Sequence, residues 1–128
     1  LHKNKKLNVI TDEIGSKYFQ LLENKETSVV IFEYRKKVDE NLQDGNYIEE
    51  VIFEISNNVN SLNLNDNELQ TTKMIYGRHC YCKGQAGYFN VINGNLILNK
   101  VNDEIKFRLN FKINEVPQII TSITENIK

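Results

Sequence analysis

The stretch GYFNVINGNLILNKVNDEIKFRLNFKI, from Gly87 to Ile113, decides the fold class of this chain. Apolar and polar residues alternate along it, which is the period of a β-strand with one buried face. Asn93-Gly94 is the preferred pair for a two-residue hairpin turn, and Asn102-Asp103 offers a second turn. With turns at both places, one face of a three-stranded meander collects Phe89, Val91, Leu96, Leu98, Ile105, Phe107, Leu109 and Phe111.

The two turns also predict the register of this meander. Around the first turn Phe89 lies opposite Leu98, and around the second turn Leu98 lies opposite Phe107. A slip of one residue would move every side chain of a strand to the other face of the sheet. The two turns therefore support one another only in this register.

Other segments of the chain also have the composition of strands. Val, Ile, Phe, Tyr and Thr are frequent in them, and clusters of Asn, Asp and Gly separate them. The segment 57–67 is either a loop or a short polar edge strand around Leu62 and Leu64. The clearest further strands are predicted at residues 28–36, 47–56 and 68–77.

Two segments fit either a helix or a strand. Residues 12–24 place apolar side chains near helical spacing, but 17–34 also fits two strands around a turn at Asn24-Lys25-Glu26, which we favour. Pro117 suits the first turn of a helix, and the isoleucines after it form one helical stripe. A final strand fits residues 117–127 as well, so both alternatives stay open there.

These patterns predict an all-β fold: a single antiparallel β-sandwich or open barrel of about eight or nine strands, with or without one short C-terminal helix. A chain of 128 residues can bury a core without a metal or a disulfide. We expect a single β domain at residues 7–128, preceded by a mobile basic tail at residues 1–6. The chain starts with Leu1 rather than Met, which fits a removed signal peptide or lipid-anchor segment and fits trimming equally well.

Charge and hydropathy narrow the classes of partner. Lys and Arg total 16 and Asp and Glu total 17, so the formal net charge is -1. A nucleic-acid-binding protein normally carries a basic stripe that supplies most of its affinity, and we therefore expect no nucleic-acid partner. The longest apolar run is VVIF at 29–32, which is far shorter than a membrane-spanning helix, so no transmembrane segment is predicted.

Both cysteines of the chain stand in the segment RHCYCKG, residues 78–84. In an extended strand alternate residues share a face, so Cys80 and Cys82 point the same way as Arg78, while His79 points the opposite way. Side-chain rotation alone can bring two such sulfurs within reach of one metal ion. The candidate metal ligands are therefore Cys80, Cys82 and His79, with copper or zinc as the candidate ion.

Other interpretations of this segment compete with metal binding. A disulfide between Cys80 and Cys82 would require a kink, because alternate Cβ atoms on one strand face lie about 6.6 Å apart. A reactive thiolate would require a nearby base, and His79 faces away from both sulfurs. We favour two cysteines buried as core residues of a strand, which predicts neither a cofactor nor a catalytic residue.

A basic stripe runs along the strand that ends the meander. Lys106, Arg108 and Lys112 point away from its apolar face. Such a stripe is usually solvated and discourages pairing with another chain. Glu49, Glu50 and Glu54 are candidates to face it from another strand.

The stretch from Gly87 to Ile113, with its Asn-Gly turn and alternating apolar residues, resembles the strand-turn-strand endings of uncharacterised small β-sandwich domains. These domains occur in secreted proteins and envelope lipoproteins of Gram-negative bacteria. The resemblance implies a sandwich fold and an extracytoplasmic location, either periplasmic or attached to the envelope. It brings no functional residues with it.

A non-catalytic extracytoplasmic binding or interaction domain fits these features best, with an unidentified protein or small molecule as its partner and a lipid tether upstream of residue 1 as one means of attachment. The sequence favours this over an enzyme without deciding the matter. One alternative is a lipocalin-like carrier of a small apolar ligand, which would need an internal cavity. The other is a thiol-dependent copper-binding or redox protein that uses Cys80 and Cys82.

Overall fold

The computed structural model describes residues 1–37, 46–80 and 84–128 of the chain. These residues form ten strands and one 3-10 helix, and the strand pairings are antiparallel. In chain order the elements are β1 (Lys5–Thr11), β2 (Lys17–Glu23), β3 (Thr27–Lys37), β4 (Asn46–Ser56), β5 (Ser61–Asn65), η1 (Asp66–Thr72), β6 (Ile75–His79), β7 (Gly87–Asn90), β8 (Gly94–Val101), β9 (Glu104–Phe111) and β10 (Ser122–Ile127).

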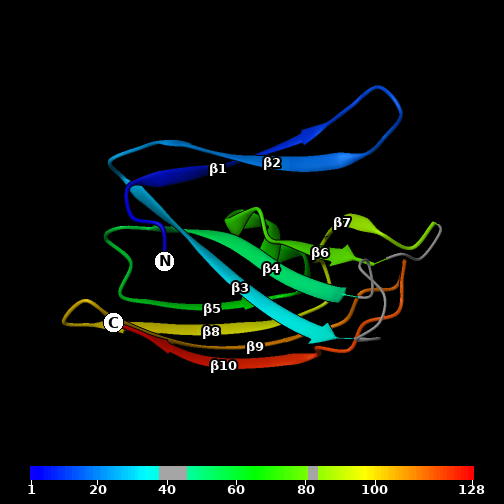
Figure 1. Cartoon of the computed structure of the whole chain (residues 1–128). Coiled ribbons are helices and arrows are strands. Elements are labelled where there is room, and N and C mark those ends of the chain that lie inside the picture. Colours follow the sequence, from blue (N-terminus) through cyan, green and yellow to red (C-terminus); the bar gives the residue numbers. More distant parts are fainter. Residues whose placement is uncertain (38–45, 81–83) are drawn as a thin grey trace.

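The strands form three layers (Figure 1). The hairpin β1-β2 is the first layer, a sheet of order β3-β4-β6-β7 is the middle layer, and a sheet of order β10-β9-β8-β5 is the third. The predicted all-β class is confirmed. Within the described ranges the sheets are open rather than closed into a barrel, and they contain one or two strands more than expected.

The main core fills the space between the two four-stranded sheets. Phe53 of β4 meets Phe107 of β9 edge to face, with ring centroids 5.4 Å apart. Tyr76 of β6 packs against Phe111 of β9 with tilted rings, whose centroids lie 5.9 Å apart. Besides these rings the core contains Val30, Val51, Ile55, Leu69, Met74, Val91, Leu96, Leu98, Ile105, Leu109, Ile113, Val116 and Ile123.

Strand β4 is apolar on both faces because it lies in the middle layer. Val51 and Phe53 face the main core, whereas Ile52 between them is buried against Leu7 of the hairpin. Burial on both faces produces a continuous apolar run instead of alternation. The runs VVIF in β3 and VIF in β4 therefore mark the middle layer of the molecule.

The predicted turn at Asn102-Asp103 is confirmed. Strand β8 pairs with β9 so that Leu98 lies opposite Phe107. Asn102 and Asp103 have φ angles of 51° and 67°, which is the backbone that a two-residue primed turn requires.

The hairpin predicted at Asn93-Gly94 is wrong. Strand β7 pairs with β6, where Phe89 lies opposite Tyr76, so Phe89 does not pair with Leu98. Gly94 is needed because a Cβ atom there would lie 2.1 Å from the carbonyl oxygen of Asn110, at a φ of +147°. The chain crosses between the two sheets at this point, and the predicted apolar face survives because both strands turn it toward one core.

The strands predicted within residues 17–34 are present, but they do not pair with each other. Strand β2 pairs with β1, and β3 pairs with β4. The backbone N–H of Asn24 donates to the carbonyl oxygen of Asn4 at 3.0 Å, and the Thr27 hydroxyl donates to the carbonyl oxygen of Lys5 at 2.7 Å. These bonds lead the chain from the hairpin down into the middle sheet, and residues 12–24 form no helix.

Three other segments resolve the remaining alternatives. The first half of the strand predicted at 68–77 is instead helix η1, because the buried Leu69 and a bond from the Asn65 N–H to the Glu68 carboxylate, at 3.1 Å, stabilise a helical turn. Strand β5 forms at the sheet edge, as one of the two alternatives for 57–67 predicted. Within 117–127 the chain forms strand β10 and no helix.

The N-terminal residues lie against the middle sheet. Strand β1 already begins at Lys5, within the tail expected at residues 1–6. The backbone N–H of His2 donates to the carbonyl oxygen of Val29 at 2.8 Å, and the Val29 N–H donates to the carbonyl oxygen of His2 at 3.0 Å. Lys5 and Lys6, which the prediction assigned to the tail, therefore belong to β1.

Candidate functional site

The residues predicted from RHCYCKG do not come together as a metal centre within the described part of the chain. Cys80 is disulfide-bonded, and Cys82 lies outside the described residues. A cysteine binds a metal ion as a thiolate, so metal binding by Cys80 would first require reduction of its disulfide. Across residues 1–37, 46–80 and 84–128, no group of three His, Cys, Asp or Glu side chains is placed to hold a metal ion. Copper or zinc binding stays a prediction.

His79 belongs to a small polar cluster on the hairpin side of the middle sheet. Its Nε2 atom lies 2.6 Å from Oε1 of Glu50, and its ring meets the ring of Tyr88 edge to face at 5.1 Å. The Tyr88 hydroxyl donates to the same Glu50 oxygen at 3.2 Å, and Phe19 of the hairpin packs on the Tyr88 ring. As predicted, His79 and Arg78 point to opposite faces, since Arg78 bonds Tyr47 on the core side.

The pKa values in this cluster follow from these contacts. The hydrogen bond with His79 lowers the pKa of the Glu50 carboxyl group, against the opposing effect of burial. Burial, together with the nearby Glu50 charge, raises the pKa of Tyr88 to about 12. At neutral pH the cluster therefore holds an ionised carboxylate beneath a neutral phenol, and it helps to fix the hairpin on the sheet.

Glu49 is the buried charge of the main core, with 2% of its surface exposed. Its Oε2 atom accepts hydrogen bonds from the hydroxyls of Tyr47, at 2.6 Å, and Tyr76, and from the N–H of Ile119, at 2.8 Å. Its Oε1 atom accepts from the N–H of Ile120 at 2.7 Å. Glu49 thus holds the segment that leads into β10 against the middle sheet, and we call these contacts the Glu49 clamp.

Two further observations support a structural role for the clamp. Burial raises the pKa of Tyr76 far above its usual value, and burial and the Glu49 carboxylate raise that of Tyr47. Both phenols therefore stay protonated and keep donating. Arg78 braces Tyr47 through an Nε hydrogen bond of 3.1 Å and lies over its ring, 5.2 Å from the centroid.

The expectation that Glu49, Glu50 and Glu54 face the basic stripe is wrong. Glu49 is buried in the core, and Glu50 pairs with His79. Glu54 faces the hairpin and accepts from the backbone N–H of Leu7 at 2.9 Å. All three carboxylates therefore have their partners in the core or on the hairpin side of β4, and none of them pairs with the basic stripe.

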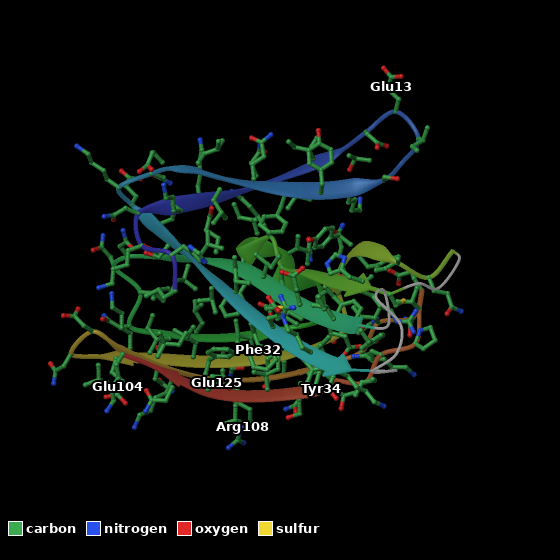
Figure 2. The ribbon with its side chains drawn as sticks, in the orientation of Figure 1. Glu13, Phe32, Tyr34, Glu104, Arg108 and Glu125 are labelled. Carbon is green, nitrogen blue, oxygen red and sulfur yellow. The ribbon has the colours of Figure 1, made fainter. Side chains whose placement is uncertain are left out.

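The outer face of the sheet β10-β9-β8-β5 carries the basic stripe, and Figure 2 shows Arg108 pointing away from the sandwich on this side. We call this surface the outer face. Strand pairing arranges its side chains in rows across the strands. One row contains Asn99, Lys106 and Asn126, and the next contains Ile97, Arg108 and Thr124.

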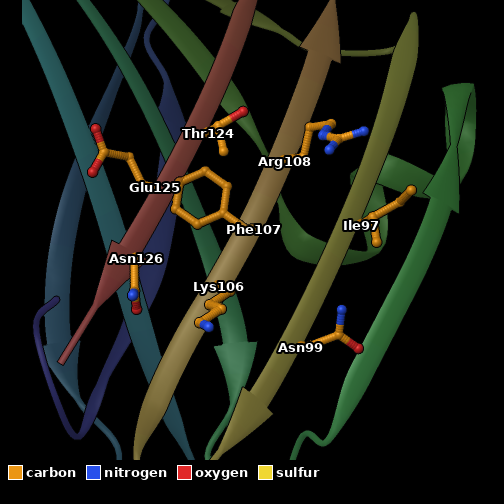
Figure 3. A pocket seen from close by; sticks show the side chains of 8 residues that line it. All are labelled: Ile97, Asn99, Lys106, Phe107, Arg108, Thr124, Glu125 and Asn126. Atoms are coloured by element: carbon orange, nitrogen blue, oxygen red, sulfur yellow. The ribbon is translucent and has the colours of Figure 1, made fainter.

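These two rows line an open hollow of about 620 Å³ (Figure 3). Its volume lies in the range of ligand sites, about 300–1,000 Å³. Three neighbouring strands contribute to it, so its side chains are fixed by a sheet rather than by loops. Phe107 and Glu125 lie at its floor and edge, on the face of their strands that turns toward the core.

The chemistry of the hollow is polar and cationic. Asn99 and Asn126 offer amide donors and acceptors, and Thr124 offers a hydroxyl. Lys106 lies 3.9 Å from Glu104, with 68% of its side chain exposed. Arg108 takes part in none of the ion pairs formed between described residues. The hollow therefore presents the Arg108 guanidinium, outside the ion pairs of the described residues, beside Lys106 and uncharged polar groups, with the Glu125 carboxylate at its edge.

Sequence patterns identified the direction of the basic stripe but not the hollow. The outward asparagines of NLILNK and the outward Lys and Arg of KFRLN were a usable signal, since they alternate with buried leucines. The row partner from β10 was missing, because residues 117–127 fit a helix as well as a strand. Without the third strand, the rows could not be assembled.

Comparison of the chain with family models, curated proteins and solved structures found no match. No helix within the described ranges has the length and apolar character needed to cross a membrane. A function for the chain can therefore be proposed only from its own geometry.

Proposed function

We propose that the protein is a non-catalytic, extracytoplasmic binding domain and that the outer face of the sheet β10-β9-β8-β5 is its binding surface. The observation that carries this proposal is that the outer side of one four-stranded sheet is covered and the outer side of the other is exposed. The middle sheet has its outer side covered by the hairpin, with Leu7, Ile52 and Ile75 buried between them. The third sheet leaves its outer side open and hollowed.

The side chains of the outer face suit binding. A β-sheet holds them in fixed rows, which keeps a binding surface preorganised and lowers the entropy lost when a ligand binds. Ile97 adds apolar contact area, with 40% of its surface exposed.

The rival functions have less support. A lipocalin-like carrier needs space between its sheets, and the space here is filled by side chains such as Phe53, Tyr76 and Leu98. A thiol-dependent copper protein needs free thiolates, and Cys80 is disulfide-bonded. The same disulfide supports an extracytoplasmic location, because disulfides persist in oxidising compartments. The resemblance to secreted and envelope β-sandwich domains supports it too.

An NMR titration of the full chain tests the proposal against both rivals. The amide spectrum is recorded with three kinds of probe: soluble neutral and acidic polysaccharides, the apolar dye anilinonaphthalene sulfonate, and Cu(I). We expect a polysaccharide to shift amides of β8, β9 and β10 around Ile97, Arg108 and Thr124. The proposal fails if no probe shifts the amides of β8, β9 and β10. A shift of core amides by the dye, or of His79 and Cys80 by Cu(I), would then favour the corresponding rival.

A further inference from the structure

We propose that the outer face binds an acidic polysaccharide, a polyhydroxylated chain whose sugar units carry carboxylate groups. This inference rests on the proposed function, because it names the ligand class for the same surface. The evidence is the combination, at fixed spacing, of the Arg108 guanidinium, the Lys106 ammonium, two amides and the exposed Ile97, in a hollow that has Glu125 as its one carboxylate.

The charge of the hollow selects the anion. The guanidinium of Arg108 presents five N–H donors in a planar fork, which matches a carboxylate through two parallel hydrogen bonds. No ion pair between described residues occupies it. Its cross-strand neighbours are Ile97 and Thr124, both uncharged. Binding a carboxylate would therefore not require Arg108 to leave another partner.

The neutral side chains select hydroxyl groups. Asn99 and Asn126 flank Lys106 across the strands, so a ligand in this row meets an amide, an ammonium and a second amide in turn. Each amide can donate to one hydroxyl and accept from another, which suits the adjacent hydroxyls of a sugar ring. Ile97, beside Arg108, offers an apolar patch for the C–H surface of such a ring.

The spacing of the rows favours a chain over a single sugar. Neighbouring strands lie about 4.8 Å apart, which is close to the length of one pyranose unit in a polysaccharide. A polymer that crosses β8, β9 and β10 would therefore place successive sugar units over successive strands. A nucleic acid fits less well, because its affinity depends on many phosphate contacts and the two rows supply only Lys106 and Arg108 as cations.

Isothermal titration with polygalacturonate tests the inference, with Arg108→Gln as the variant. Loss of a charge-assisted bidentate contact should weaken binding about tenfold. Arg35→Gln is the matched control, because it removes the same charge from the exposed Arg35 of β3, which pairs with Glu33 on another sheet. This control should bind as the wild type does. Arg108→Lys, which keeps the charge and loses the fork, should fall between the two.

Three further polymers separate the causes of binding. Polyacrylate carries carboxylates without hydroxyls, dextran carries hydroxyls without carboxylates, and dextran sulfate carries sulfates. We expect polygalacturonate to bind more tightly than each of them. Equal binding of polyacrylate or dextran sulfate would overturn the inference in favour of unspecific attraction to polyanions. Equal binding of dextran, unchanged by Arg108→Gln, would overturn the acidic class and leave the outer face as a binding surface.

The remaining outcome separates this inference from the function on which it rests. If polygalacturonate does not bind, the acidic class is wrong. The proposed function then fails as well only if the NMR titration finds no probe that moves β8, β9 and β10. Thermal melting of Arg108→Gln should match that of the wild type, because Arg108 is exposed on the outer face, and this shows that lost binding is not lost folding.

Discussion

Replacement of Glu49 by Gln is the sharpest test of what holds this fold together. The carboxylate accepts four hydrogen bonds: two from tyrosine hydroxyls and two from the backbone N–H groups of Ile119 and Ile120. Glutamine has one acceptor oxygen and one amide group that can only donate. If its oxygen takes the place of Oε2, its amide nitrogen faces the N–H of Ile120, which then loses its acceptor.

The magnitude follows from these bonds. A buried N–H without a partner costs about 1–3 kcal/mol, and each of the three remaining bonds loses about 1 kcal/mol when its acceptor becomes neutral. Relief of the buried charge offsets part of this loss. We therefore expect Glu49→Gln to lower the free energy of unfolding by about 2–4 kcal/mol. Tyr76→Phe removes a single donor and should lower it by about 1 kcal/mol.

Urea denaturation measures these differences. With a slope of about 2 kcal/mol per molar urea, the midpoint of Glu49→Gln should fall by about 1–2 M. Native-state hydrogen exchange adds a local readout, because the amides of Ile119 and Ile120 should exchange faster in the variant. Glu13→Gln is the control: Glu13 lies exposed at the hairpin tip (Figure 2), and its loss should change stability by less than about 0.5 kcal/mol.

Two results would refute this account of the clamp. One is a Glu49→Gln variant within about 0.5 kcal/mol of the wild type, which would mean that the four bonds have no net value. The other is a destabilised variant whose Ile119 and Ile120 amides exchange at the wild-type rate. In that case the loss of stability would have its origin elsewhere in the core.

Three other predictions test separate features of the molecule. The pKa of Glu50 is lower in the folded chain than in the unfolded one, so the unfolded chain binds more protons in acid. The stability of the wild type should therefore fall as the pH decreases from about 5. Thermal melting of Glu50→Gln between pH 6 and 3 should show a shallower decline. Gly94→Ala should lower the free energy of unfolding, measured by urea denaturation, by about 3 kcal/mol or more, because its Cβ would lie 2.1 Å from a carbonyl oxygen. Gly15→Ala is also at positive φ but has nothing within 4 Å, and it should lower that free energy by about 1 kcal/mol. Equal losses for the two variants would contradict the steric argument. Replacing Cys80 and Cys82 by Ser should leave polygalacturonate binding unchanged, and a loss of binding in a folded double variant would move the site to the cysteines.

The sequence predicted the register between β8 and β9, and the reason is physical. One face of this pair is buried and the other is open, so alternation was strict and only one register buried Leu98 and Phe107 together. The hairpin predicted at Asn93-Gly94 is wrong, because the preference of Asn-Gly pairs for hairpin turns depends only on the residues of the turn. Glycine is needed at position 94 because of the carbonyl oxygen of Asn110, a neighbour that only the folded sheet brings close.

Part of the candidate site was accessible to the same reasoning. The outward direction of Lys106 and Arg108 was predicted, but a row needs a partner from β10, and that strand could not be told from a helix. The Glu49 clamp left a signal that was misinterpreted. Glu49 alternates with Val51 and Phe53, so strand periodicity placed it on the core face all along. A carboxylate in an apolar stripe indicates a buried network rather than a surface charge.

The clamp and the outer face are linked through β10. Ile119 and Ile120 are fixed by Glu49, and β10 begins directly afterwards at Ser122, with the N–H of Phe111 donating to the carbonyl oxygen of Thr121 at 3.0 Å. A strand at the edge of a sheet pairs on one side only, so β10 depends on β9 and on its anchored start for its position. Strand β10 supplies one of the three residues in each row of the hollow. Loosening the clamp should therefore change the geometry of the outer face, although no residue of that face is replaced. The buried Glu49 carboxylate is in this way a condition for the geometry of the outer face.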